Sequence, residues 1–346
     1  MTAADGAGWL RLKRLALNRA QPLAAYLELS YRCNWRCVFC YNPRHHDRTG
    51  LALDEWIRVL DDLRELGALS LTLTGGEPLA YARFPELLRA ASARRFALRL
   101  FTNGALVSDA LADVIAEARP LAVELSLHGG CAQTHDRATG VPGSFVAMLA
   151  GLRRLRERGV PLRLKSLLTS LNHDELDAMI ALAEELGVPH QLDATVTPRD
   201  DGDRGPLLYQ APAEAVARMY RRLAERNGLP SVERETGGVN CGLGRITLAV
   251  DPEGEVYPCL QWRHSSLGNV RTTRLTELWR TSSVREQAAA VSTAANERML
   301  AQGGALSRFP FCPALAAQHT SDPLRPDSEH AVHSAIVESL RTRAAG

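Results

Sequence analysis

Six short apolar runs alternate with helical patterns between residues 24 and 197, and this alternation is the strongest constraint on the fold of the 346-residue chain. The apolar runs have the length of buried strands and cover residues 24–31, 69–74, 96–102, 121–127, 162–168 and 191–197. Helical periodicity fills the intervals over residues 53–66, 85–93, 108–118, 144–158 and 172–186. Repeated strand–helix units predict an α/β fold, in which helices cover a parallel sheet.

The pattern changes after residue 197, where a segment rich in Asp, Gly and Pro at 198–206 interrupts the alternation. Beyond it, two short apolar segments flank the turn sequence Asp-Pro-Glu-Gly at 251–254, which predicts a β-hairpin. We therefore expect a second, smaller α+β domain. The predicted organisation is an N-terminal extension (1–23), an α/β domain (24–200), the small domain (201–320) and a C-terminal tail (321–346).

The charge balance argues against partners that bind by electrostatics alone. Lys and Arg number 41 against 39 acidic residues, a net charge of +2, so neither nucleic acid nor a membrane surface is an expected partner. No apolar run approaches the ~20 residues of a membrane-spanning helix. The N-terminus lacks the apolar core of a signal peptide, so we expect a cytoplasmic protein.

Three of the seven cysteines lie within eight residues, directly after the first predicted strand. Cys33, Cys37 and Cys40 are spaced C-x3-C-x2-C, with Phe39 before the last. Three thiolates can ligate three irons of one cubane and leave the fourth iron open to a small ligand. A structural zinc site is the alternative, but closed zinc sites take four N or S ligands.

A glycine-rich turn follows the second predicted strand, with the sequence Gly75-Gly76-Glu77-Pro78. By itself this sequence indicates only a turn. About 35 residues after the cysteine loop, it resembles the motif with which the radical S-adenosylmethionine (SAM) superfamily binds the amino group of SAM. The resemblance implies a partial (β/α)6 barrel and a [4Fe-4S] cluster whose open iron chelates SAM. Reductive cleavage of SAM would release a 5′-deoxyadenosyl radical that abstracts hydrogen from a substrate.

The resemblance also implies a set of SAM-binding residues beyond the cluster ligands. They lie in the cysteine loop and at or near the carboxyl ends of strands, where α/β folds build their sites. The implied set is Phe39, Gly75, Gly76, Glu77, Pro78, Thr102, Asn103, Ser126, Lys165 and Ser166. Three of these residues have a structural alternative. Thr102 and Ser126 could simply cap strand ends, and Lys165 could be a solvated cation.

The other cysteines of the small domain form a second set, Cys241, Cys259 and Cys312. Gly254 stands five positions before Cys259, and Leu-Gly-Asn and Leu-Thr-Glu-Leu-Trp sequences follow it. This layout resembles the SPASM and twitch extensions of radical SAM enzymes and implies one auxiliary iron–sulfur cluster in a twitch-like domain. The fourth ligand is either substrate or one of His264, His319 and Asp322. The structural alternative is three buried, unligated cysteines.

Cys131 stands apart from both sets, at the exit of the fourth predicted strand. A thiol there could donate hydrogen to a substrate radical, although a buried spectator is the plainer interpretation. By family analogy the substrate is a ribosomally made precursor peptide that is crosslinked or epimerised. The alternatives are an aminocyclitol or sugar dehydrogenase and a non-catalytic iron–sulfur scaffold. Expected partners are an electron donor such as flavodoxin or ferredoxin and a separate leader-peptide-binding protein.

Overall fold

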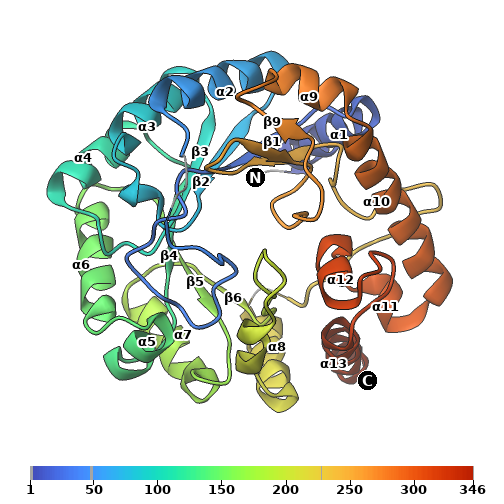
Figure 1. The fold of residues 1–346 in the computed structure, drawn as a ribbon. Coiled ribbons are helices and arrows are strands. Elements are labelled where there is room, and N and C mark those ends of the chain that lie inside the picture. Colours follow the sequence, from blue (N-terminus) through green and yellow to red (C-terminus); the bar gives the residue numbers. More distant parts are fainter. Residues whose placement is uncertain (1–2, 47–49, 227, 346) are drawn as a thin grey trace.

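The computed structural model describes residues 3–46, 50–226 and 228–345 and places nine strands in one sheet (Figure 1). The strand order is β6-β5-β4-β3-β2-β1-β7-β8-β9. The strands are β1 (Ala24–Glu28), β2 (Ser70–Thr74), β3 (Ala97–Thr102), β4 (Ala122–Ser126), β5 (Leu162–Leu167), β6 (His190–Asp193), β7 (Thr247–Val250), β8 (Glu255–Tyr257) and β9 (Gly268–Asn269).

The first six strands are parallel, as the alternating pattern predicts. On its other side β1 pairs in parallel with β7, while β8 and β9 continue the sheet with antiparallel pairing. The Asp-Pro-Glu-Gly hairpin is thus confirmed between β7 and β8. Because β7 joins the same sheet, the small C-terminal part is attached to the α/β part along a whole strand.

Helices form an arc outside the sheet, and the C-terminal helices continue that arc (Figure 1). The α/β part carries α1 (Ala3–Arg19), α2 (Leu53–Leu66), α3 (Phe84–Ala93), α4 (Asp109–Glu117), α5 (Ala132–Thr139), α6 (Ser144–Glu157) and α7 (Leu176–Glu185). After it come α8 (Ala213–Arg226), α9 (Leu275–Thr281), α10 (Ser283–Gln302), α11 (Gly304–Arg308), α12 (Pro313–Thr320) and α13 (Ser328–Ala345). Short 3-10 turns lie at η1 (Pro78–Ala80), η2 (His173–Glu175) and η3 (Gly205–Tyr209).

The helix α2 shows how sequence determines these elements. Its apolar residues recur at helical spacing, so Trp56, Leu60 and Leu63 share one face and are fully buried in the core against the sheet. The Glu55 carboxylate accepts a hydrogen bond from the Ala52 amide at the amino end. Gly67 ends the helix with φ +84°, a conformation that glycine adopts without strain.

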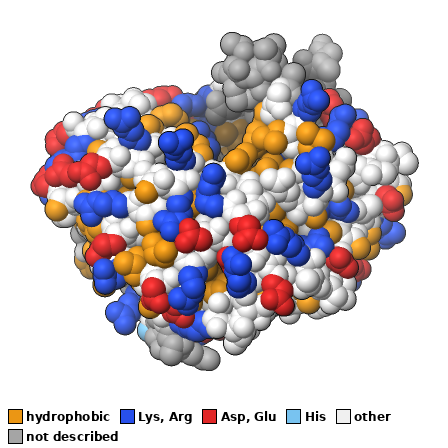
Figure 2. Space-filling view, turned by 90° about the horizontal axis from the view of Figure 1, so that it is seen from above, with side chains coloured by type: hydrophobic (Ala, Val, Ile, Leu, Met, Phe, Trp, Pro, Cys, Tyr) orange, Lys and Arg blue, Asp and Glu red, His pale blue; other side chains and the backbone are white. Residues whose placement is uncertain are grey.

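The molecular surface carries both signs of charge. Seen from above (Figure 2), Lys and Arg side chains alternate with carboxylates, and hydrophobic side chains gather around a hollow. None of the helices in the described part of the chain has the length and apolar character needed to cross a membrane.

Candidate functional site

A cavity of about 340 Å³ lies where the cysteine loop meets the carboxyl ends of the strands. The loop leaves β1 after Glu28, and its three thiols, Cys33, Cys37 and Cys40, all line the cavity. Six of the ten predicted cofactor-binding residues line it as well: Phe39, Gly75, Gly76, Thr102, Asn103 and Ser126. The structure therefore brings together two motifs and two strand ends that are distant in the sequence.

Backbone hydrogen bonds hold the cysteine loop against the end of α5. The Arg36 amide donates to the Thr139 carbonyl at 2.8 Å, and the Val38 amide donates to Ala138 at 3.1 Å. Asn103 reaches the loop from the end of β3, with its Nδ2 at 2.7 Å from Asn34 Oδ1 and 3.8 Å from Cys33 Sγ. The loop is thus held by elements on both sides.

The three thiols are suited to a cluster more than to free cysteines. Burial raises the pKa of Cys33 to about 11 and raises the pKa of Cys37 and Cys40 as well, and at Cys33 and Cys40 this outweighs the nearby guanidinium groups of Arg36 and Arg199. A bound iron cluster supplies positive charge and deprotonates coordinating thiols. Among the described residues no three His, Cys, Asp or Glu side chains are grouped around one metal ion. A cubane does not require this, because each thiolate ligates a different iron.

The turn at Gly75 and Gly76 packs directly on the backbone that precedes Cys33. The Gly76 amide donates to the Ser30 carbonyl at 2.7 Å, and the Glu77 amide donates to the Arg32 carbonyl at 2.8 Å. A Cβ on Gly76 would lie 2.5 Å from the Tyr31 oxygen, and Gly75 has φ +124°. Both glycines are therefore required by close backbone approach, and the turn and the cysteine loop form one unit.

Glu77 does not line the cavity, and direct binding of SAM by its carboxylate stays a prediction. The side chain is fully buried, and its oxygens accept hydrogen bonds from the Leu79 amide (3.0 Å), the Thr102 hydroxyl (2.6 Å) and the Asn103 amide (2.8 Å). Burial raises its pKa to about 7 in spite of these bonds. Pro78 begins η1 behind the same turn and is also absent from the cavity wall. Glu77 positions Thr102 and Asn103, which do line the cavity.

Lys165 and Ser166 also lie outside the cavity wall. Lys165 Nζ is 2.6 Å from the buried carboxylate of Glu124 and 3.7 Å from the centre of the Phe101 ring, and Phe101 lines the cavity. The Ser166 hydroxyl is 2.8 Å from Nε2 of His190. The two neighbours therefore contact different groups, and a role for either residue beside SAM stays a prediction.

Cys131 is exposed at the amino end of α5 and does not line the cavity. Its Sγ lies 3.4 Å from a carboxylate oxygen of Glu175, which also accepts a 2.7 Å hydrogen bond from the Gly130 amide. The thiol thus lies outside the cavity wall, and hydrogen donation by Cys131 stays a prediction.

Several cavity residues were not identified from the sequence. His128 follows Ser126 in the same motif, and its imidazole is buried, with a pKa lowered to about 3 by burial and by neighbouring His135, so the ring is neutral. Thr195 and Thr197 follow β6, and Gln261 comes from the small C-terminal part. The motif Ser-Leu-His-Gly could have indicated His128, whereas nothing local to Gln261 shows that its loop reaches this cavity.

The second cysteine set also converges. Cys241, Cys259 and Cys312 pack against one apolar group formed by Leu243, Trp262, Ala288 and Ala314. Burial raises the pKa of Cys312 to about 12, and also raises that of Cys259. At Cys259 burial raises the pKa more than the nearby Arg263 guanidinium lowers it.

The three candidate fourth ligands lie in different surroundings. The His264 ring is 3.9 Å from the Trp262 ring, centre to centre, and Trp262 belongs to the apolar group around the cysteines. His319 lines a second cavity together with Cys312, and its Nδ1 lies 3.3 Å from Asp327. Asp322 is exposed and accepts a hydrogen bond from the Leu324 amide. A non-cysteine ligand to the auxiliary cluster stays a prediction.

The first site is suited to an iron–sulfur cluster and SAM at the carboxyl edge of the sheet. Comparison with protein families supports this interpretation. Residues 27–186 match the radical SAM superfamily, and residues 241–302 match SPASM, an iron–sulfur cluster-binding domain. The chain belongs to the radical SAM superfamily and carries a SPASM domain. It is therefore a radical SAM enzyme, and its cofactors are a [4Fe-4S] cluster with SAM and auxiliary iron–sulfur binding in the SPASM domain.

Two named relatives match 48% and 75% of the chain. A PqqA peptide cyclase from Ruegeria pomeroyi is 30% identical over 275 residues, which are 75% of this chain and 74% of that protein. Another, from Granulibacter bethesdensis, is 30% identical over 168 residues, and the match spans 45% of its length. Streptococcus suis SuiB bound to S-adenosylmethionine shares the fold, with TM-score 0.70 and 16% identity over 89% of this chain and 77% of that one.

Proposed function

We propose that this enzyme modifies a ribosomally made precursor peptide and forms a crosslink within it. The single observation that carries the proposal is the 30% identity to a PqqA peptide cyclase over about three quarters of both chains. SuiB, whose fold this chain shares with TM-score 0.64, has been seen bound to its precursor peptide SuiA. Peptide modification is therefore compatible with both the sequence relatives and the fold.

The site supports crosslinking more than epimerisation. Epimerisation ends when a hydrogen atom is returned to the substrate radical, and Cys131, the thiol predicted for that step, is exposed and outside the cavity. A crosslink instead removes a pair of hydrogen atoms from the peptide. One leaves on 5′-deoxyadenosine, and the other leaves as a proton and an electron. An auxiliary iron–sulfur cluster, when bound, supplies an electron acceptor for that second loss.

The chain's own residues prepare this chemistry by shaping the cavity. The thiols lie on one wall, and the glycine turn with Thr102 and Asn103 forms another. Gln261 of the SPASM domain faces the same space, so a substrate there meets both parts of the chain. Phe39 and Trp35 give the cavity apolar sides that limit the entry of water around a radical. We further propose that a ferredoxin- or flavodoxin-type protein supplies the electron and that a separate protein binds the leader peptide.

Anaerobic turnover with SAM and dithionite tests the proposal. Candidate peptides encoded beside the gene are incubated with reconstituted enzyme and analysed by mass spectrometry. We expect 5′-deoxyadenosine together with a peptide that has lost a pair of hydrogen atoms. Deuterium incorporation from D₂O without that loss would indicate epimerisation. Oxidation of an aminocyclitol or sugar with no change in any peptide would contradict the peptide assignment, and absence of 5′-deoxyadenosine under every condition would support the scaffold alternative.

A further inference from the structure

A buried ion pair joins the SPASM domain to the end of β1, directly beside the cysteine loop, here called the cluster loop because it carries Cys33, Cys37 and Cys40. Arg263 Nη2 lies 2.5 Å from Glu28 Oε2, and the side chains are 6% and 0% exposed. The Arg263 guanidinium also lies 4.9 Å from the centre of the Tyr257 ring, and its Nε is 3.6 Å from Asp200. A charge pair as buried as this one cannot lose a partner cheaply, because the remaining charge stays desolvated.

The second oxygen of Glu28 continues the contact toward the SAM site. Tyr41 donates its hydroxyl to Glu28 Oε1 at 2.9 Å, and the same hydroxyl lies 3.3 Å from the Gly75 carbonyl. Tyr41 follows the cluster ligand Cys40 directly in the chain, and it lines the cavity with Gly75. Glu28 is therefore held between the SPASM domain on one side and both SAM-site motifs on the other.

The linker at residues 198–206 and the loop after Cys259 both contact the Glu28–Tyr41 pair. The Asp200 amide donates to the Tyr41 carbonyl at 2.9 Å, so the segment between the two parts of the chain also rests on Tyr41. Arg263 stands four residues after the cysteine Cys259 and two after Gln261, which faces the SAM cavity. Arg263 thus ties the loop after Cys259 to the cluster loop.

We propose that Arg263 is a positioning residue for the SAM site, acting from the SPASM domain through Glu28 and Tyr41. It fixes the relative placement of the cluster loop, the Gly75 turn and Gln261, so that SAM binding depends on the SPASM domain being in place. The inference concerns SAM binding and is independent of which substrate the enzyme modifies.

The variant Arg263→Gln in the full-length reconstituted enzyme tests this, with SAM as the probe. We expect iron content to match wild type, while the affinity for SAM falls about tenfold or more, as is typical when a supporting partner of a metal-site residue is lost. The change that SAM causes in the electron paramagnetic resonance spectrum of the reduced cluster should weaken in parallel. Arg263→Lys keeps the charge and should restore part of the affinity.

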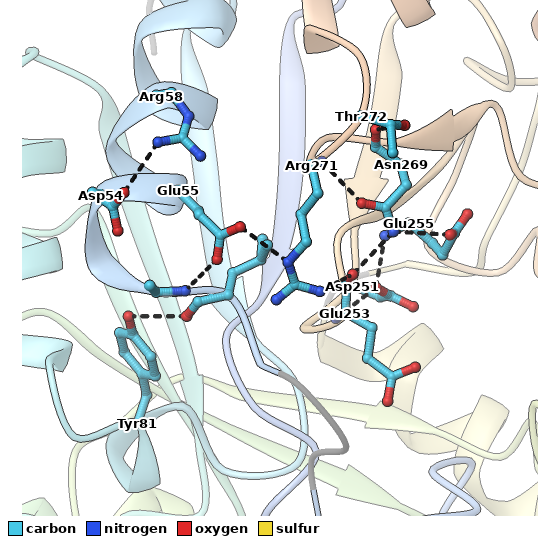
Figure 3. A network of polar contacts seen from close by, with 12 residues as sticks. Asp54, Glu55, Arg58, Tyr81, Asp251, Glu253, Glu255, Asn269, Arg271 and Thr272 are labelled. Atoms are coloured by element: carbon cyan, nitrogen blue, oxygen red, sulfur yellow. Dashed lines mark hydrogen bonds and ion pairs between the residues drawn. The ribbon is translucent and has the colours of Figure 1, made fainter.

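Arg271→Gln is the matched control, because Arg271 also connects the SPASM domain to the α/β part. Its Nε is 3.0 Å from Glu55 of α2, neither residue lines the SAM cavity, and the Arg271 side chain is 30% exposed (Figure 3). We expect wild-type affinity for SAM in this variant. An equal loss in Arg271→Gln would overturn the proposal, since it would show that any loosening between the two parts has the same effect.

A milder variant keeps the test decisive if Arg263→Gln does not fold. Tyr41→Phe removes only the hydroxyl that links Glu28 to the Gly75 turn and leaves every charge in place. We expect it to bind SAM more weakly than wild type with its full iron content. Unchanged SAM affinity and an unchanged spectrum in Arg263→Gln, or in Tyr41→Phe where the arginine variant is unfolded, would overturn the proposal.

Discussion

At the scale of single residues, the buried carboxylate of Glu77 holds in place residues that line the cavity. Its oxygens accept hydrogen bonds from Leu79, Thr102 and Asn103, and hydrogen bonds to a charged acceptor are each worth about 1.5–3 kcal/mol. Thr102 and Asn103 in turn line the cavity, and Asn103 contacts the cysteine loop. The carboxylate therefore fixes the end of β3 relative to the cluster loop.

We expect Glu77→Gln to weaken SAM binding about tenfold while the cluster stays intact. The amide has one acceptor oxygen in place of two, so one of the three donors loses its partner, whereas no iron ligand changes. Titration of SAM against the anaerobic protein gives the affinity, and visible absorbance reports the cluster. Glu86→Gln, an exposed carboxylate paired with Arg83, is the control and should change neither. Lost cluster absorbance with normal SAM affinity would contradict this role of Glu77.

At the scale of elements, the glycine turn and the cysteine loop behave as one packed unit. Two backbone hydrogen bonds join them, from Gly76 to Ser30 and from Glu77 to Arg32. Both contacts depend on the absence of a side chain at residue 76, because the nearest atoms are backbone oxygens that cannot rotate away.

Gly76→Ala should therefore impair both SAM binding and cluster assembly. Its Cβ would lie 2.5 Å from the Tyr31 oxygen and 2.6 Å from the Arg32 oxygen, so the turn must shift and break the two hydrogen bonds. Iron content after reconstitution and SAM affinity are the measurements, and both should fall. Gly8→Ala in α1 adds a methyl group with nothing within 4 Å and should leave both unchanged. Wild-type values for Gly76→Ala would show that the turn tolerates displacement.

Strand periodicity and motif spacing are local signals, so the sequence predicted the parallel strands, the three cysteines of the first site and six of the other residues that line its cavity. The sequence did not predict which way a side chain points, and that direction decides which groups the residue contacts. Lys165 and Ser166 are neighbours on one strand and point to opposite faces, so their side chains contact different groups. Gln261 joins the cavity only because β7 pairs with β1, a contact between residues more than 200 positions apart that no local pattern encodes.

At the scale of the whole molecule, one continuous sheet carries both cysteine sets. Cys33 follows β1, Cys259 follows β8, and β7 lies between these strands in the sheet. The two cluster-binding parts are thus joined by a strand pairing and by the Arg263–Glu28 ion pair. A rigid connection of this kind favours a fixed spacing between the two sites, which electron exchange between them would require.

Iron content tests whether both sites are filled. Anaerobic reconstitution should give about eight irons per wild-type chain, four in each of two cubanes, and about six if the SPASM domain holds a [2Fe-2S] cluster. Replacing Cys33, Cys37 and Cys40 together with Ala should remove four irons and abolish SAM cleavage, measured as 5′-deoxyadenosine. The remaining irons, about four or about two, should stay with Cys241, Cys259 and Cys312.

The control is Cys131→Ala, which alters an exposed thiol outside both sets and should keep the full wild-type iron content. A triple variant that reconstitutes with essentially no iron would show that the SPASM cysteines of this chain are packed without a cluster, and a triple variant that still produces 5′-deoxyadenosine at the wild-type rate would contradict the assignment of the first site.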